Sequence, residues 1–246
     1  MGGDAVLLIA LLLAAAAALY STVGHGGASA YLAILALFSV SPEVMRPTAL
    51  ALNLIVAGFA LLRFGMAGQV NFRLFGIFAV TAAPAAFLGG TISLPAEYYR
   101  PLVGIILWLA AARLIWQPAV LADRPVRPPP LAVALPTGAG LGLLAGLTGT
   151  GGGIFLSPLI ILFGWEGTRK TSGVAAAFIF VNSLAGLAGN VASVAHLPSE
   201  LPWFVAAVAG GALVGTWLGV ARLPRTRLLQ WLGIVLVIAG AKLLFT

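Results

Sequence analysis

Two glycine-rich stretches interrupt long apolar runs: Gly24-His25-Gly26-Gly27 and, later in the chain, Gly149-Thr150-Gly151-Gly152-Gly153. Each stretch is followed by another, shorter apolar segment. A glycine cluster releases the backbone from helix and lets it approach a neighbour closely. In a lipid bilayer such backbone survives only where it is buried in protein or lines a polar cavity. Two breaks at matching places in two halves are the sequence feature that best predicts a transporter's binding site.

The composition places the chain in a lipid bilayer. Of the 246 residues, 61% are hydrophobic and 8% are charged, whereas soluble domains average roughly 45–50% and 25%. Apolar stretches of about 18 residues recur along most of the sequence, which predicts a multi-pass membrane protein. The net charge of +7 comes from Lys and Arg scattered singly between apolar runs, so we expect no nucleic-acid partner. The absence of Cys excludes disulfides and thiolate chemistry.

Ten apolar segments are expected to be helices, so the predicted fold class is an all-α polytopic membrane protein. The segments cover residues 5–23, 28–40, 47–64, 74–93, 98–117, 131–148, 153–164, 171–195, 202–221 and 226–245. The first is interpreted as a mature span, because it lacks the preceding basic residues of a signal peptide. A polar, proline-rich linker over 123–130 separates an N-terminal repeat (1–122) from a C-terminal repeat (131–246), since consecutive prolines favour a stiff polyproline II spacer.

The two halves match each other in order, which indicates an internal repeat. Besides the glycine stretches, the matching blocks are Leu37-Phe38 with Leu162-Phe163, Gly65-Met66-Ala67-Gly68-Gln69-Val70 with Gly186-Leu187-Ala188-Gly189-Asn190-Val191, and Leu94-Pro95, Gly104 and Arg113 with Leu223-Pro224, Gly233 and Lys242. Five segments in each half mean an odd number of crossings. The halves are therefore predicted to face opposite ways, as inverted repeats.

Basic residues predict the orientation of this arrangement. The side of the N-terminus holds Arg46, Arg100 and Lys242, and the other side holds the remaining ten of the 13 Lys and Arg. The positive-inside rule then puts both termini outside the cytoplasm, in a bacterial-type inner membrane. Segments 28–40 and 153–164 reach only roughly 18–20 Å as helix, against a hydrocarbon core of about 30 Å, so each is interpreted as a half-helix. The segment before each one either crosses fully or forms a hairpin with its glycines deep in the protein.

A half-helix that begins inside the membrane presents unpaired N–H groups and the positive end of its dipole there. We therefore predict that the glycine stretches hold an oxyanion such as a sulfonate, a sulfite or a carboxylate. The predicted binding residues in these stretches are Gly24, His25, Gly26, Gly27, Gly149, Thr150, Gly151, Gly152 and Gly153. The alternative is that the glycines permit close helix packing, as small residues do throughout membrane bundles.

Polar side chains in the neighbouring segments complete the predicted site. Thr48 and the pair Thr171-Ser172 open the third segment of each half, where a hydroxyl either donates to an anion or bonds its own helix. Asn53 and Asn182 are costly to bury, so each needs a helix or a substrate partner. His25 takes the place of Thr150 in the first stretch. It either binds substrate or carries a proton, or it is hydrogen-bonded within the bundle.

Charged residues complete the prediction. Arg46 and the pair Arg169-Lys170 flank the short segments and are expected to attract anions at the two mouths, unless they are solvated loop cations. The six acidic residues fall in or near loops, which disfavours a carboxylate proton relay or a bound cation. The sequence predicts neither a cofactor nor a metal. It also lacks HExxH, paired-acid and phosphate-binding motifs, so we do not expect an enzyme.

The two glycine stretches, each followed by a short apolar helix and then by a helix start rich in Ala, Thr and Ser, resemble the TauE/SafE sulfite exporter family over roughly residues 5–245. The resemblance implies a permease that moves sulfite, sulfoacetate or other sulfur-containing or organic anions. It carries over the glycine stretches, Thr48 and Thr171-Ser172 as binding candidates. Pro158 stands where the family's second copy often has proline, whereas the first copy has Ala33.

We therefore expect a transporter, in the first place an exporter, that works by alternating access around the two glycine stretches. Its partners are a small anion and the lipid bilayer, with a homo-oligomer allowed. One alternative is an anion channel built on the same stretches. Another, from a different class, is a membrane-embedded enzyme with His25 as its acid or base.

Overall fold

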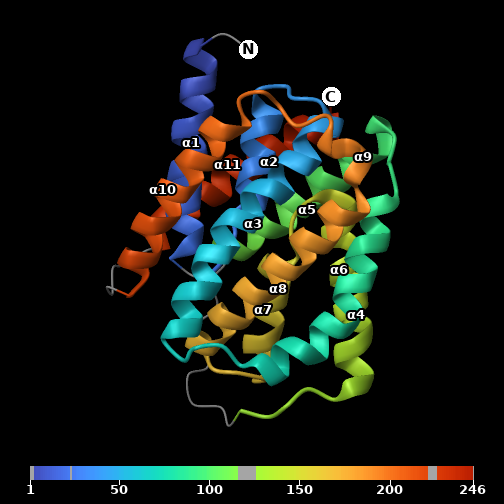
Figure 1. Cartoon of the computed structure of the whole chain (residues 1–246), viewed down its shortest axis with the longest axis vertical. Coiled ribbons are helices and arrows are strands. Elements are labelled where there is room, and N and C mark those ends of the chain that lie inside the picture. The colour runs from blue at the N-terminus through green and yellow to red at the C-terminus, as the bar shows by residue number, and fades with distance from the viewer. Residues whose placement is uncertain (1–2, 23, 116–125, 221–225, 246) are drawn as a thin grey trace.

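Helices make up the fold. The structure is a computed structural model that describes residues 3–22, 24–115, 126–220 and 226–245. No strand occurs among these residues, which confirms the all-α prediction (Figure 1). The helices are α1 (Gly3–Ser21), α2 (Ala28–Leu37), α3 (Pro42–Met66), α4 (Phe72–Thr91), α5 (Ala96–Ile115), α6 (Leu131–Thr148), α7 (Gly153–Leu162), α8 (Thr168–Gly189), α9 (Val191–Val194), α10 (Leu201–Val220) and α11 (Thr226–Phe245).

Each predicted segment coincides with a helix, but the segment predicted over 171–195 was too long. Helix α8 ends at Gly189, and the N–H of Asn190 bonds the carbonyls of Gly186 and Leu187. The separate turn of α9 follows. The helix ends because Asn190, with φ −107° and ψ 34°, leaves the helical conformation after closing the last turn.

The segment predicted from residue 47 begins earlier, at Pro42. Ser41 precedes the helix in extended conformation, and proline at the first helical position loses no hydrogen bond. This earlier start has a consequence for the predicted site, because it moves Arg46 from an expected loop into α3.

The described part of the linker is not helical. Residues 126–130 form no helix, and Pro130 has φ −58° and ψ 133°, close to polyproline II. The remaining linker residues, 123–125, lie outside the described residues. The division into an N-terminal and a C-terminal repeat stays a prediction.

By length and composition, five of the described helices can cross a membrane: α1, α3, α4, α6 and α8. Helices α2 and α7 have 10 residues each, which gives about 15 Å of helix. That is half of the roughly 30 Å hydrocarbon core, as expected of half-helices. The start of α1 and the end of α11 lie at the same end of the molecule (Figure 1).

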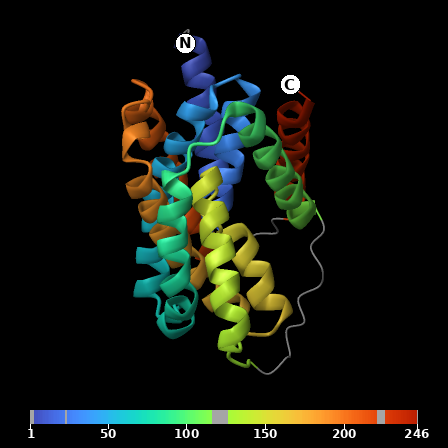
Figure 2. The same cartoon turned by 90° about the vertical axis from the view of Figure 1, so that its right-hand side faces the viewer.

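The packing links the two halves of the chain. Helices α3 and α8 pack against each other, and so do α5 and α11. The fourth helix of the first half, α4, packs against α6, and its counterpart α10 packs against α1. Figures 1 and 2 both show α4 beside α6. The first helix of each half thus packs against the fourth helix of the other half. The inverted orientation of the halves stays a prediction.

Glycines set the distance between α4 and α6. A Cβ on Gly142 of α6 would overlap the carbonyl oxygen of Ala82 in α4, and a Cβ on Gly146 would overlap that of Ala86. The contact between α10 and α1 uses the same device, because a Cβ on Gly215 would overlap the carbonyl of Ala18. Close approach of backbones is therefore the role of these glycines in the helix interiors.

Candidate functional site

Both glycine stretches turn the chain from a long helix into a short one. We call Gly24–Gly27, between α1 and α2, tip 1, and Gly149–Gly153, which joins α6 to α7, tip 2. The residue before each short helix is Gly27 (φ 95°) or Gly152 (φ 75°). Residues with a Cβ rarely adopt this left-handed backbone, so both positions require glycine.

The two tips lie against the same two side chains. A Cβ on Gly26 or on Gly151 would overlap Asn53 of α3, and either would lie 3.0 Å from Cγ2 of Ile179 in α8. Stretches separated by more than 120 residues thus meet where α3 and α8 pack together. This meeting point is the candidate site.

Asn53 joins the tips through hydrogen bonds. Its Oδ1 accepts the N–H of Ala28, the first residue of α2, at 3.1 Å. Its Nδ2 donates to the carbonyl of Thr150 in tip 2 at 3.4 Å. The side chain is fully buried. Asn53 therefore has helix partners, one of the two possibilities that the sequence left open.

Hydroxyl groups surround tip 1 and bond to each other or to its backbone. The hydroxyls of Tyr20 and Ser29 are 2.7 Å apart, and the hydroxyl of Tyr31 donates to the carbonyl of Gly26 at 2.6 Å. His25 is half-buried, and its ring lies edge-on to that of Tyr20 with 6.5 Å between centroids. The histidine thus lies in tip 1, where it was predicted, and its binding role stays a prediction.

The hydroxyl of Thr150 in tip 2 already takes part in a hydrogen bond. The hydroxyl of Thr148 donates to the carbonyl of Leu144 at 2.6 Å. The hydroxyl of Thr150 lies 3.0 Å from that of Thr148 and therefore donates its own proton to it. Thr150 has no hydroxyl proton left to offer an anion in this arrangement.

Three buried polar side chains have no hydrogen-bond partner among the described residues: Thr48, Asn182 and Ser183. In Asn182 both the nitrogen and the oxygen of the amide are unpaired. Buried polar groups are nearly always paired, so these three point to a ligand or to water. Thr48 and Asn182 were predicted from the sequence. Ser183 was missed, although a Ser directly after Asn in an apolar segment was a usable signal.

The hydroxyls at the start of α8 serve their own helix. Thr171 donates to the carbonyl of Gly167 at 3.0 Å, and Ser172 donates to that of Thr168 at 3.4 Å. The backbone carbonyl of Ser172 packs against Gly24 of tip 1, where a Cβ would overlap it. These contacts fit the alternative expectation, in which each hydroxyl bonds its own helix.

Arg46 is buried and is not a solvated loop cation, while its effect on anions at a mouth stays a prediction. Its guanidinium donates to the carbonyls of Gly146 in α6 (2.9 Å) and of Gly89 (2.6 Å), Gly90 (2.8 Å) and Ile92 (2.8 Å) at the end of α4. Only 5% of the residue is exposed. The last carbonyls of a helix lack partners within it and carry its negative dipole end, which explains how a cation is stabilised here. The expectation of a solvated loop cation at this position was wrong, because Arg46 lies in α3 and its guanidinium packs against the ends of α4 and α6.

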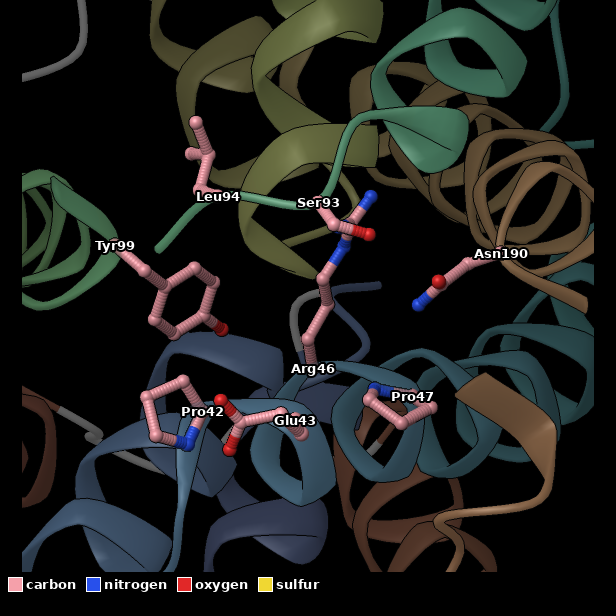
Figure 3. A pocket seen from close by; sticks show the side chains of 8 residues that line it. All are labelled: Pro42, Glu43, Arg46, Pro47, Ser93, Leu94, Tyr99 and Asn190. Atoms are coloured by element: carbon pink, nitrogen blue, oxygen red, sulfur yellow. The ribbon is translucent and has the colours of Figure 1, made fainter. Parts of the chain in front are cut away.

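Arg46 also lines a small pocket (Figure 3). The side chain extends from α3 toward Ser93, with Tyr99 on one side and Asn190 on the other. Glu43 lies on the same wall. The pocket has a volume of about 60 Å³, which is room for a few water molecules.

Arg169 and Lys170 lie in the first turn of α8 and are exposed. Both residues belong to the helix, whereas the predicted segment began after them, at residue 171. Their exposure agrees with a solvated position, and their effect on anions at a mouth stays a prediction. No group of three or more His, Asp or Glu side chains that could hold a metal occurs among the described residues.

A multi-pass helical fold with two broken-helix tips meeting at its centre defines the class of membrane transporters with paired half-helices. The family described as "Sulfite exporter TauE/SafE" matches residues 8–243. The chain is 40% identical over 229 residues to the "Probable membrane transporter protein y4hK" of Sinorhizobium fredii (strain NBRC 101917 / NGR234), covering 92% of this chain and 93% of that relative. No solved structure matches. The chain belongs to the TauE/SafE sulfite exporter family, which confirms the resemblance found in the sequence.

Proposed function

We propose that this membrane transporter moves a small sulfur-containing or organic anion, such as sulfite or an organosulfonate, by alternating access around the two tips. The observation that carries the proposal is the meeting of tip 1 and tip 2 on Asn53 and Ile179. A helix start at this place offers backbone N–H groups and a positive dipole end. Such a place favours an anion without a charged side chain.

The distribution of acidic residues supports an anionic substrate. The acids of the described chain lie in the first turn of a helix or just before one: Asp4, Glu43, Glu97, Glu166 and Glu200. None of them lies in the middle of a described helix. A carboxylate near the tips would repel an anion, and a cation carrier needs one there. We infer transport without a cation-coordinating carboxylate.

We propose export as the direction of movement, with both termini outside the cytoplasm. An inside-negative potential of 100 mV favours the exit of a singly charged anion by about 2.3 kcal/mol. No coupling ion is then required. A proton carried by His25 is an additional possibility, which the pH dependence of transport would reveal. We infer a carrier and not an enzyme, since the family and the relative both point to transport.

Reconstitution of the full chain in liposomes tests the proposal. We expect saturable flux of sulfite or sulfoacetate above that of protein-free vesicles, and faster exit when the interior is made negative. Flux that does not saturate, with currents far above carrier turnover, would favour a channel instead.

Glycine variants connect this flux to the tips. Gly26→Leu and Gly152→Leu place a side chain where Asn53 or Phe178 already lies, so each should abolish saturable flux. Gly140→Leu is the matched control, because a Cβ on Gly140 meets nothing within 4 Å. Wild-type flux in both tip variants, with the fold intact, would refute the site.

A further inference from the structure

We propose that the two tips are not equivalent: tip 2 alone binds the anion, with Ser183 and Asn182 of α8 as its side-chain ligands. The proposal rests on the transport function proposed above and identifies which part of the site takes the substrate. Three features support it: the Asn53 oxygen that occupies tip 1, the unpaired hydroxyl of Ser183 at tip 2, and the pocket beside tip 2.

Tip 1 already holds an acceptor oxygen. Oδ1 of Asn53 accepts the N–H of Ala28, the first of α2, at 3.1 Å. Gly24 and His25 donate their N–H groups back to carbonyls at the end of α1. Further N–H groups of this first turn stay unpaired, as at any helix start. An anion there would crowd the Asn53 oxygen, whose partial negative charge repels it.

Tip 2 has no such acceptor within the described chain. The N–H groups from Thr150 to Ile154 donate no hydrogen bond to any described group. Ile179, the α8 side chain that contacts both tips as Asn53 does, is apolar and cannot accept one. The N-terminal end of α7 therefore keeps its positive dipole end uncompensated.

One unpaired donor, the hydroxyl of Ser183, lies beside tip 2. Oγ of Ser183 lies 3.3 Å from the position that a Cβ on Gly151 would take, and it has no partner. Asn182 and Ser183 follow Ile179 by three and four residues, so they share the face of α8 that meets the tips. Both are fully buried. The Ser183 hydroxyl, the Asn182 amide nitrogen and the backbone N–H groups can all donate to the oxygens of a small oxyanion, and Oδ1 of Asn182 needs a donor of its own, such as water.

Two residues that line a pocket also contact the start of tip 2. A Cβ on Gly149 would lie 3.1 Å from the carbonyl oxygen of Arg46, and the Tyr99 hydroxyl donates to the carbonyl of Thr148 at 2.9 Å. Arg46 and Tyr99 both line the pocket of about 60 Å³ in Figure 3. Glu43 lines it too, so its wall carries charges of both signs. The pocket thus borders tip 2, through the residues at its start.

The test measures sulfite affinity by thermal shift of purified full-length protein, together with sulfite flux in liposomes. Ser183→Ala and Asn182→Leu should each weaken the apparent affinity at least fivefold. Both should leave the ligand-free protein as stable as the wild type or more so, because each removes an unpaired buried polar group. Ser21→Ala is the matched control. Ser21 is equally buried, but its hydroxyl bonds the carbonyls of Ala18 and Ala212, so this variant should lose stability and keep its affinity.

The remaining outcomes separate this inference from the proposed function. Wild-type vesicles that move neither sulfite nor sulfoacetate would overturn both. Normal sulfite flux with affinities within twofold of wild type in both α8 variants would overturn only the inference and leave a water site. A loss of sulfite affinity in His25→Ala that exceeds the loss in Ser183→Ala would place the anion at tip 1 and overturn it as well.

Discussion

Asn53 and Ile179 contact the same pair of glycines, Gly26 and Gly151, from helices in opposite halves of the chain. One of the two side chains is an amide and the other is a hydrocarbon. The glycines Gly26 and Gly151 thus lie against an amide of α3 and a hydrocarbon of α8, although α8 also places the Ser183 hydroxyl beside Gly151. The amide bonds both tips.

Asn53→Leu keeps the approximate shape of the side chain and removes both hydrogen bonds. The N–H of Ala28 and the carbonyl of Thr150 are then buried without this partner. We expect a loss of roughly 1–3 kcal/mol in the free energy of unfolding, seen as a lower melting temperature in detergent. Ile179→Val, which removes one methyl group from the other side, should cost about 0.5–1.5 kcal/mol. An Asn53→Leu variant as stable as the wild type would show that the amide does not hold the tips together.

We expect the main role of Arg46 to be stabilisation of the fold. Arg46→Met leaves four helix-end carbonyls without their donor, and we expect a loss of at least about 3 kcal/mol, because each buried acceptor left unpaired costs roughly 1–3 kcal/mol. Arg46→Lys keeps the charge but lacks the planar fork, so it should fall between that variant and the wild type. Chemical denaturation of the purified wild type, Arg46→Met and Arg46→Lys proteins measures the three free energies of unfolding. The exposed Arg169→Met is the control and should change stability by no more than about 0.5 kcal/mol. Equal stability of the Met and Lys variants would contradict the role of the charge.

Substitutions of Gly142 and Gly140 in α6 distinguish the effect of close helix packing from that of helix propensity. Gly142→Ala places a methyl group onto the carbonyl of Ala82 and should destabilise the protein by roughly 1–3 kcal/mol. Gly140→Ala, two residues earlier and facing open space, should be neutral or stabilising by up to about 1 kcal/mol. Melting temperatures of the two variants give the comparison. The same sign of change in both would mean that the contact between α4 and α6 is looser than described.

The glycine stretches and the ten apolar segments could be predicted because backbone conformation and hydrophobic length are local properties. The position of Arg46 could not, since a basic residue directly before Pro47 looks like a loop residue until the carbonyls of Gly89 and Gly146 are brought to it from other helices. Asn53 could be marked as costly to bury, but its two partners come from tips in different halves of the chain. Pairing across long separations is what a single sequence leaves undetermined.

The inverted orientation can be tested with single cysteines, because the chain has none of its own. Ser41 precedes α3 and Thr168 opens α8, the third helix of each half, and both are exposed. If the halves are inverted with the termini outside, Ser41→Cys should react in intact cells with a membrane-impermeant maleimide. Thr168→Cys should react only after the membrane is opened. Exposed Ser199 lies on the same predicted side as Ser41, so Ser199→Cys should label like Ser41→Cys. Labelling of Ser41→Cys and Thr168→Cys from the same side would mean parallel halves, and the reverse of the expected pattern would put the termini in the cytoplasm.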